Sequence, residues 1–491
     1  MIKEKKITSP LLHFDPEQQT EFTNRDFAAS IGTATPSRAM KDFSPFQQKM
    51  EAAGLGKAAI GAFERGFHLL SAGEKGLITE EAINPSTEVP TYQAIAKLNP
   101  SWQPDLLAQT VVLKLNGGLG TGMGLQKAKS LLEVKNGETF LDLIAEQITT
   151  LRADTGAQVR FLLMNSFSTS EDTLAALASS PLKGENVEML QNKVPKIEAA
   201  TMQPVAWPTD PEHEWCPPGH GDLYPALAGS GWLDSLLADG IQYAFVSNSD
   251  NLGATLDAGL LNWFAASGSP FAMEVTRRTE ADKKGGHLAI RKSDQRLILR
   301  EVAQCPEGDL EAFQDISRHQ FFNTNNLWLN LAALKEALDA SDGVLPLPVI
   351  QNAKTVDPRD KTSTAVWQLE TAMGAAIECF DGAVAVEVPR SRFAPVKTTA
   401  DLFALRSDAY EKRPDGSVGL VPARQGKPPV VKLSGEYKLV DSLAQLGVVP
   451  SLVDAESITI EGQVNFAENV TITGNAEFLD HHEVPAGRYG A

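Results

Sequence analysis

Residues 111–130 read VVLKLNGGLGTGMGLQKAKS. An apolar run, typical of a buried strand, gives way to five glycines between Gly117 and Gly124, and Lys127 and Lys129 follow. Glycine accepts positive φ angles and lets a ligand approach the backbone closely. A strand that ends in such a loop is typical of phosphate binding through backbone N–H groups. The stretch therefore predicts a phosphate or nucleotide site; the alternative is a tight turn between a strand and a helix.

Two common phosphate-binding patterns do not fit this loop. The G-x-G-x-x-G pattern needs a glycine at position 123, which is Met123. The P-loop spacing is met by Gly117 and Gly122, but Met123 and Gly124 stand where that pattern has Lys and Ser or Thr. The loop therefore represents another kind of phosphate site, or none.

The surrounding sequence indicates an α/β domain. Between about residues 110 and 400, short apolar runs alternate with helical patterns, which is typical of a largely parallel sheet. In such sheets, ligands bind at the carboxyl ends of the strands, where the glycine loop lies. We expect buried strands at 111–115, 159–164, 243–247, 271–275 and 384–388, and a crossover helix at 139–153.

The two ends of the chain have a different character. Residues 1–40 are polar and predict a loosely attached arm, whereas 43–77 show an apolar stripe at helical spacing. From Leu446 the chain divides into hexads, LGVVPS, LVDAES, ITIEGQ, VNFAEN, VTITGN and AEFLDH, each beginning with an aliphatic residue. This period predicts a β-helix docked on the body or on a partner subunit, and the alternative is a plain β-meander.

We expect an N-terminal arm and helical segment packed on the core (1–108), a catalytic domain (109–402), and a C-terminal linker and β-helix (403–491).

Composition restricts the function. The 491 residues have a formal net charge of −18, which argues against general affinity for nucleic acid or acidic membranes. No run of 18 apolar residues occurs, the N-terminus lacks the apolar core of a signal peptide, and the three cysteines are far apart. We expect a cytoplasmic protein without disulfide bonds. The eight histidines form no H-E-x-x-H or zinc spacing, and no G-x-S-x-G motif occurs.

Four further stretches combine polar groups with turn residues. WCPPGHGDLYPAL (215–227) presents His220 between two glycines, either as a ligand contact or as an ordinary surface or core histidine. YAFVSNSDNLGA (243–254) runs from a strand to Asp250, which is either a Mg²⁺ ligand or part of an Asx turn. FFNTNNLWLNL (321–331) has asparagines that either join loops or bind a polyhydroxyl ligand. VPRSRFAPVKTTADLF (388–403) contains Arg390, Arg392 and Lys397, which suggest anion binding rather than a solvated basic face.

Together these stretches resemble the UTP–glucose-1-phosphate uridylyltransferases, or UDP-glucose pyrophosphorylases, of the eukaryotic type that also occurs in some bacteria; we expect a bacterial member. Matching motifs occur in the family's order: KLNGGLGTGMG, PPGHGD, SNSDNLGA, KGGHL, FNTNNLW, QLETAMGAAI and VPRSRFAPVKTT. The resemblance implies an α/β nucleotidyltransferase core of glycosyltransferase-A-like type, with a mixed, largely parallel sheet, and a C-terminal left-handed β-helix. It implies a reversible, Mg²⁺-dependent reaction of UTP with glucose 1-phosphate, giving UDP-glucose and pyrophosphate. Homo-oligomers through the β-helix are an open expectation.

The resemblance also assigns roles to residues. Lys397, Lys129 and His220 match groups at the reacting phosphates, and Asp250 matches the metal ligand. Positions around the uridine are Leu115, Asn116, Gly117, Gly118, Gln191 and Gly219. Positions around the sugar are Asn248, Gly286, Glu301 and Asn325.

The chain departs from the family pattern at three places. Lys127-Ala128 replaces Gly-Pro before Lys129, which leaves two candidate loop lysines. Lys196 stands where the family has an arginine, so a phosphate role at this position is in doubt because lysine lacks the bidentate fork. Ser249 replaces an aliphatic residue. Two alternatives stay open: an enzyme for galactose 1-phosphate or several sugar phosphates, and an inactive nucleotide-sugar sensor.

Overall fold

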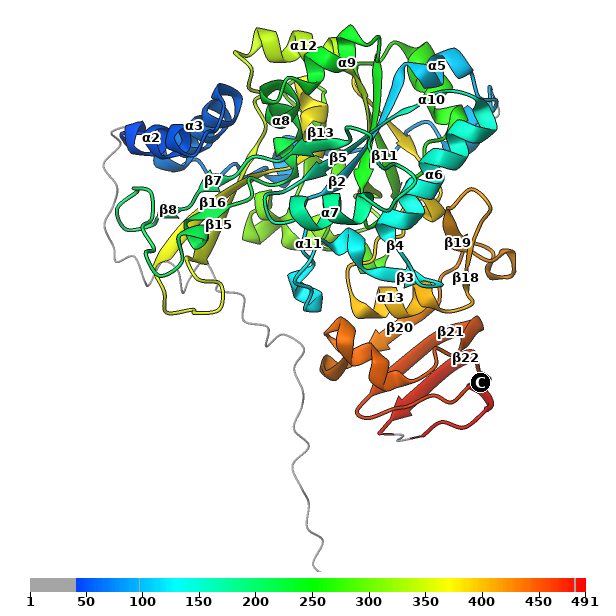
Figure 1. Ribbon diagram of the computed structural model, residues 1–491. Coiled ribbons are helices and arrows are strands. Elements are labelled where there is room, and N and C mark those ends of the chain that lie inside the picture. Colours follow the sequence, from blue (N-terminus) through cyan, green and yellow to red (C-terminus); the bar gives the residue numbers. More distant parts are fainter. Residues whose placement is uncertain (1–40, 97, 481–482) are drawn as a thin grey trace, which may run out of the picture.

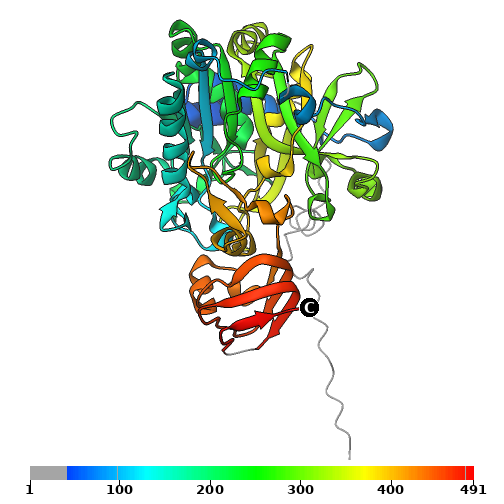
Figure 2. The ribbon, with the colours of Figure 1, turned by 90° about the vertical axis from the view of Figure 1, so that its right-hand side faces the viewer.

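The computed structural model describes residues 41–96, 98–480 and 483–491. The predicted arm, residues 1–40, lies outside the described residues. The body is built on a ten-stranded sheet with helices on both faces, and a smaller C-terminal sheet packs beneath it (Figures 1 and 2). In the described residues, no helix has the length and apolarity that a membrane crossing requires.

The central sheet is mixed, and most of its strands run in one direction. The parallel strands at one side of the sheet, in spatial order, are β6 (Glu188–Leu190), β5 (Arg160–Asn165), β2 (Thr110–Asn116) and β10 (Tyr243–Asn248). The pairings give the same direction to β11 (Phe271–Arg277), β17 (Val384–Glu387) and β12 (His287–Arg291). The opposite direction is taken by β14 (Phe321–Asn330), β13 (Leu297–Arg300) and β1 (Ile83–Pro85). The predicted α/β class with a mixed, largely parallel sheet is confirmed.

Each face of the sheet packs against its own set of helices. Strand β2 is buried along its length, with Val112 in one apolar core and Val111 and Leu113 in the other. The first core includes α6 (Phe140–Thr155) and α10 (Ala258–Ser267). The second core includes α8 (Leu223–Gly229), α9 (Trp232–Ala238) and α12 (Leu331–Ala340). The predicted crossover helix is α6, which begins where Thr139 and Asp142 form a capping box.

The apolar stripe at 43–77 forms two helices rather than one continuous helix. They are α2 (Ser44–Ala52) and α3 (Lys57–Ser71). The chain turns between them at Gly54, whose φ of +78° lies in the left-handed region that glycine favours. The buried rings of Phe46, Phe63 and Phe67 then pack together and against a small sheet. That sheet consists of β15 (Val349–Thr355), β16 (Ala365–Thr371) and β8 (Ile197–Glu198).

The C-terminal sheet pairs only parallel strands. They are β20 (Val430–Leu433), β21 (Ser451–Glu461), β22 (Val470–Leu479) and β23 (Gly487–Tyr489). Ile458 pairs with Ala476 and Ile460 with Phe478, so at these positions β21 and β22 are offset by eighteen residues, or three hexads. The residues that begin the hexads are all buried: Leu446, Leu452, Ile458, Val464, Val470 and Ala476. A plain meander would pair its strands antiparallel, so the meander alternative is wrong, and the left-handed β-helix stays a prediction.

Shorter elements complete the chain. The helices are α4 (Tyr92–Ala96), α5 (Pro104–Ala108), α7 (Ser170–Leu177), α11 (Leu310–Gln314) and α13 (Thr399–Arg406). The strands are β3 (Glu133–Lys135), β4 (Glu138–Thr139), β7 (Val194–Pro195), β9 (Trp215–Cys216), β18 (Tyr410–Lys412) and β19 (Val418–Leu420).

Candidate active site

The segments predicted to form the site follow strands that run in one direction. The glycine loop follows β2, the Asp250 segment follows β10, and the segment with Lys397 follows β17. Val396 donates its N–H to the Asp250 carbonyl at 3.2 Å, and Asn251 forms an antiparallel bridge with Pro395. The topology thus brings together segments that are far apart in the sequence, at the edge where α/β proteins bind ligands.

The glycines of the loop after β2 differ in what surrounds them. Gly120 and Gly124 have φ angles of +68° and +80°, so they form turns that other residues rarely adopt. A Cβ on Gly117 would lie 2.6 Å from Gln191 Oε1, so the Gln191 side chain lies directly against this glycine. A Cβ on Gly118 would meet nothing within 4 Å. The bare backbone of Gly118 therefore faces open space, as a ligand-binding position should.

Several residues predicted around the uridine lie next to one another. Gln191 donates from Nε2 to the Gly219 carbonyl at 3.0 Å and faces Gly117. Leu115 is buried, and its carbonyl accepts a hydrogen bond from Ser249. Asn116 is different, because its buried amide donates to Asn165 at 2.7 Å and to Thr173 at 3.0 Å. Its side chain joins the strand ends rather than facing a ligand.

His220 is fixed by its neighbours in one tautomer. Its Nδ1 accepts a hydrogen bond from the Met373 N–H at 3.0 Å, and burial lowers the pKa of His220 to about 4. The ring is therefore neutral at pH 7, and its proton lies on Nε2, which can donate. A Cβ on Gly219 would lie 2.5 Å from the Thr371 carbonyl oxygen, and one on Gly221 2.3 Å from Thr371 Oγ1. The two glycines thus let the histidine turn pack against the end of β16.

Lys129 and Asp250 are in direct contact. Lys129 Nζ lies 2.7 Å from Asp250 Oδ2, and the two side chains are 14% and 18% exposed. The other carboxylate oxygen, Asp250 Oδ1, is buried and has no hydrogen-bond partner among the described residues. Lys127, by contrast, is exposed. Of the two candidate loop lysines, the structure therefore places Lys129 next to the predicted metal ligand.

The predicted sugar positions form a second group beside Lys397. A Cβ on Gly286 would lie 2.5 Å from Glu301 Oε2, so the carboxylate lies against this glycine. Burial raises the pKa of Glu301, and the positive charge of Lys397 opposes that rise, which places the two groups within electrostatic range. Lys397 is exposed, with Nζ 5.8 Å from the centre of the Phe393 ring. Asn325 has a φ of +59° and accepts a hydrogen bond from Asn323 Nδ2 at 2.8 Å.

Asn248 is the last residue of β10 and directly precedes the Asp250 segment. Its carbonyl accepts a hydrogen bond from the Asn251 N–H at 3.3 Å. The Asn251 amide donates to the Arg392 carbonyl at 3.0 Å, and its oxygen accepts from the Ala394 N–H at 3.1 Å. This asparagine therefore joins the Asp250 segment to the chain that leads to Lys397.

The anion-binding interpretation of the basic stretch at 388–403 is wrong for its two arginines. Arg392 forms a buried bidentate pair with Glu274, at 2.7 and 2.8 Å, and Arg390 pairs with Asp282 at 2.8 and 3.0 Å. Lys196 is likewise buried and donates to the Val356 carbonyl at 2.9 Å, so it serves the fold. The charges of the two arginines are already compensated by carboxylates within the chain, which leaves Lys397 as the exposed cation of its stretch.

The asparagines at 323–326 serve both of the suggested purposes in part. Asn326 is buried and donates to Glu274 at 3.0 Å, so it joins strands. Asn323 and Asn325 bond to each other beside Gly286, whose carbonyl accepts a hydrogen bond from the Asn323 N–H at 3.2 Å. Only this second pair lies at the predicted sugar position.

Two buried charged side chains near the site, Lys114 and Asp222, were not among the predicted residues. Lys114 is only 2% exposed and donates to the Ser247 hydroxyl at 2.8 Å and the Ala254 carbonyl at 2.6 Å. Asp222 is buried and accepts hydrogen bonds from the Asn192 backbone at 2.6 Å and side chain at 3.0 Å. A charge inside the apolar run VVLKL was a usable signal for Lys114, because a buried charge must find partners.

A metal site made by protein side chains alone is not present in the described residues. Across residues 41–96, 98–480 and 483–491, no three or more His, Cys, Asp or Glu side chains gather so that they could hold a metal ion. Mg²⁺ bound with a nucleotide typically uses one or two carboxylates together with phosphates and waters. Asp250, with its unpartnered oxygen, fits that donor set.

The chain is similar to known proteins over most of its length. The sequence model of the family described as UTP–glucose-1-phosphate uridylyltransferase matches residues 61–473. The chain belongs to this family. A relative with that name from Solanum tuberosum is 42% identical over 402 residues, covering 81% of each chain. Another from Saccharomyces cerevisiae is 42% identical over 409 residues, covering 82% of this chain and 80% of the relative.

Solved structures of the family are similar over most of the chain. One is a UDP-glucose pyrophosphorylase variant from Leishmania major in complex with UDP-glucose, with 46% identity and a TM-score of 0.86 over 92% of this chain and 98% of that one. Another, titled a UDP-glucose phosphorylase from Trypanosoma brucei, has 48% identity and a TM-score of 0.83 over 91% of this chain and 97% of that one. The predicted family and enzyme class, a nucleotidyltransferase, are confirmed. The roles of single residues stay predictions.

Proposed function

We propose that the chain transfers the uridylyl group of UTP to glucose 1-phosphate, giving UDP-glucose and pyrophosphate, and catalyses the reverse reaction. The observation that supports this most directly is the contact of Lys129 with Asp250, beside the segment of Lys397. Two polyanions must meet for the reaction to occur. In a chain of net charge −18, cations from two distant segments therefore converge where phosphates are expected.

The reaction needs no covalent enzyme intermediate. A phosphate oxygen of the sugar attacks the α-phosphorus of UTP in line, the new P–O bond forms, and the bond to the bridging oxygen breaks. Pyrophosphate leaves with that electron pair. Catalysis then consists mostly of positioning and of neutralising negative charge.

The residues of the site have separable roles in this proposal. Lys397 and Lys129 stabilise the charge that develops on the phosphates, and neutral His220 donates a hydrogen bond from Nε2. Gln191, with the backbone at Gly117, Gly118 and Gly219, surrounds the uridine. Asn248, Gly286, Glu301 and Asn325 surround the sugar.

We also propose that Mg²⁺ binds at Asp250 together with the phosphates of UTP. When bound, the ion would add positive charge and orient the phosphate oxygens. Removing divalent metal with a chelator should abolish turnover, and Mg²⁺ should restore it. Asp250→Asn should need more Mg²⁺ for half-maximal rate, because an amide is a weaker ligand than a carboxylate.

The decisive experiment removes the side chain of Lys397, the exposed cation that the proposal assigns to the reacting phosphates. Lys397→Ala should lower kcat by about 10²- to 10³-fold, as loss of one group that stabilises transition-state charge does. Thermal unfolding should be unchanged, since Lys397 is exposed, and Lys427→Ala, an exposed lysine outside the site, should behave as the parent chain. Near-normal turnover of folded Lys397→Ala would refute the assignment.

The same pyrophosphate-release assay tests the two alternatives. Glucose 1-phosphate should be the best of a panel of sugar 1-phosphates offered with UTP. Comparable rates with galactose 1-phosphate would support the broader enzyme, and no product with any sugar would support the sensor. We place the protein in the cytoplasm, a proposal supported by the free thiols of Cys216, Cys305 and Cys379.

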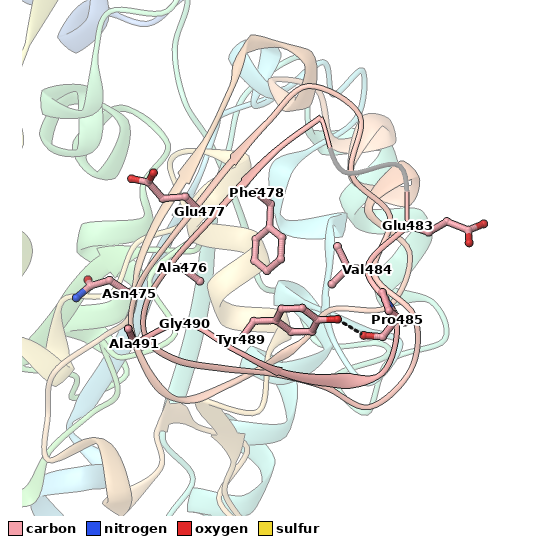
Figure 3. A pocket seen from close by; sticks show the side chains of 10 residues that line it. All are labelled: Asn475, Ala476, Glu477, Phe478, Glu483, Val484, Pro485, Tyr489, Gly490 and Ala491. Carbon is pink, nitrogen blue, oxygen red and sulfur yellow. Dashed lines mark hydrogen bonds between the residues drawn. The ribbon is translucent and has the colours of Figure 1, made fainter.

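We propose further that the hexad segment from Leu446 to the C-terminus, called the C-terminal coil, is a left-handed β-helix whose end joins subunits. A cavity of about 290 Å³ opens there, lined by residues from β22, β23 and the turn between them (Figure 3). The rings of Phe478 and Tyr489 lie inside it, 5.7 Å apart, while Glu477 and Glu483 point outward. Light scattering should find an oligomer for the parent chain, a smaller species for Tyr489→Glu, and an unchanged oligomer for Val430→Glu on β20. A monomeric parent chain would refute this proposal.

A further inference from the structure

The two carboxylate oxygens of Asp250 have different surroundings. One carboxylate oxygen, Oδ2, accepts the Lys129 ammonium at 2.7 Å, and the other, Oδ1, is buried without a partner among the described residues. The carboxylate therefore keeps unused acceptor capacity while its charge is compensated by a single contact. A carboxylate oxygen without a hydrogen-bond donor is the kind of ligand that a small divalent cation prefers.

The contact differs from the structural ion pairs nearby. Arg392–Glu274 and Arg390–Asp282 are bidentate pairs in which guanidinium groups meet both carboxylate oxygens. Such forks fix geometry, whereas a lysine ammonium is a point charge on a flexible stem. The Lys129–Asp250 pair can therefore separate without disturbing a second bond.

The backbone of Lys129 would stay in place when the pair separates. Its N–H donates to the Gly118 carbonyl at 3.0 Å, and its stem lies against Gly120, where a Cβ would be 3.3 Å from Lys129 Cγ. Only the end of the side chain needs to move. It can thus exchange a carboxylate for a phosphate while remaining anchored in the glycine loop.

We propose that Lys129 occupies the cation position on Asp250 in the nucleotide-free protein, so that a divalent metal gains this carboxylate only when a triphosphate draws Lys129 away. The inference rests on the proposed function, which assigns Lys129 to phosphate and Asp250 to metal. It adds that, without nucleotide, the contact of Lys129 with Asp250 and the binding of a metal ion by Asp250 compete with each other. Lys129 then acts as a gate that couples metal binding to nucleotide binding.

The test measures Mn²⁺ binding to the full chain without nucleotide, by electron paramagnetic resonance of the free ion. Lys129→Met removes the competing ammonium and should tighten Mn²⁺ binding by about two- to fivefold, which lies within the range of exposed ion pairs. Lys127→Met removes an exposed charge two residues away and should leave the Mn²⁺ affinity near that of the parent chain. Lys129→Gln, a second variant with an uncharged stem, should behave as Lys129→Met.

Two further measurements separate this inference from the proposed function. Asp250→Asn combined with Lys129→Met should lose the gain in Mn²⁺ affinity, which shows that the gain arises at Asp250. UTP binding, followed by calorimetry, should weaken in Lys129→Met if Lys129 contacts phosphate; unchanged UTP binding would refute that role. Equal or weaker Mn²⁺ binding by folded Lys129→Met and Lys129→Gln would overturn the gate, whatever happens to UTP.

Discussion

Lys114 shows how a residue outside the predicted site can hold it in position. Its ammonium bonds to Ser247 in β10 and to Ala254 in the segment that follows, which lie on either side of Asp250 in the sequence. Burial lowers the pKa of Lys114 to about 7, so the fold retains this group against a cost of desolvation. This cost is compatible with a positioning role, because Lys114 is far from both acceptors along the chain and holds the two positions that flank Asp250.

Replacing Lys114 should therefore affect catalysis through the Asp250 segment. In Lys114→Met the Ala254 carbonyl loses its donor and the segment can shift, so we expect kcat to fall by about 10- to 100-fold. Steady-state kinetics would show this. The matched control is Lys135→Met, since Lys135 also donates to backbone carbonyls, those of Leu405 and Arg406, but away from the site. Unchanged turnover in Lys114→Met would contradict the positioning role.

The low pKa of His220 predicts a loss of stability in acid. Burial lowers this pKa from 6.5 to about 4, so between these values the unfolded chain binds a proton that the folded chain does not. The contribution of His220 to the free energy of unfolding is present above about pH 6.5 and falls by up to about 3 kcal/mol as the pH drops to 4.

A neighbouring carboxyl acts in the opposite sense, so the test must isolate the histidine. Burial raises the pKa of Asp222 from 3.8 to about 7, and its contribution is lost as the pH rises through this range. His220→Gln keeps an acceptor for the Met373 N–H but cannot titrate. Urea unfolding at pH 7, 6, 5 and 4 should show the parent chain losing stability relative to His220→Gln; a constant difference would contradict the assigned cause.

At the residue scale, sequence patterns located candidate groups but not their partners. Lys129 and Asp250 were both predicted, yet their contact spans 121 residues and depends on the parallel pairing of β2 with β10. The same limit explains the misinterpreted arginines. The partner of Arg392, Glu274, lies 118 residues away inside β11, where a sequence pattern suggests only an apolar strand. Long-range charge pairing is a property of the fold rather than of local sequence.

At the scale of elements, the glycine loop contains positions with different purposes. Gly120 and Gly124 are required by their positive φ angles and Gly117 lies against Gln191, whereas Gly118 faces open space. Gly118→Ala should therefore leave the free energy of unfolding within about 0.5 kcal/mol of the parent chain. If the uridine lies on this backbone, the KM for UTP should rise by about tenfold, which is about 1.4 kcal/mol of lost binding.

Gly122 provides the matched control for this prediction. A Cβ on Gly122 also meets nothing within 4 Å, but this glycine is not among the positions assigned to the uridine. Gly122→Ala should leave both stability and the KM for UTP unchanged. Equal effects of the two substitutions would show that the loop responds to any loss of flexibility, and that Gly118 has no special contact with the nucleotide.

Elements with strong local signals were predicted well. The five expected strands correspond to β2, β5, β10, β11 and β17, because each is an apolar run that the sheet buries. The helix expected at 139–153 is α6, whose start is marked by a capping box. The segment 43–77 was less clear, since an apolar stripe continues across the break at Gly54 and periodicity alone cannot locate a turn.

At the scale of the whole molecule, the C-terminal coil shares a core with the body. Leu452, Ala455 and Ile458 belong to the same apolar cluster as Leu402 and Phe403 of α13 and Phe140 of α6. The Leu452 N–H also donates to Asp408 at 2.8 Å. The hexad period predicted which positions of the coil are buried. The contact of the coil with the body depends on α13, which lies before the first hexad, so the period could not predict it.

A shared core predicts that damage to the coil weakens the body. Leu452 is fully buried, so Leu452→Ala should lower the free energy of unfolding by about 2–5 kcal/mol. All seven tryptophans precede residue 403, so tryptophan fluorescence reports on the body alone. The fluorescence transition in urea should therefore move to lower concentration although no tryptophan lies in the coil. Val448→Ala, at a half-exposed hexad position, is the control and should shift it little. If the fluorescence transition stays in place while circular dichroism at β-sheet wavelengths shows an earlier loss, the coil unfolds independently and its contacts with α13 contribute little to the stability of the body.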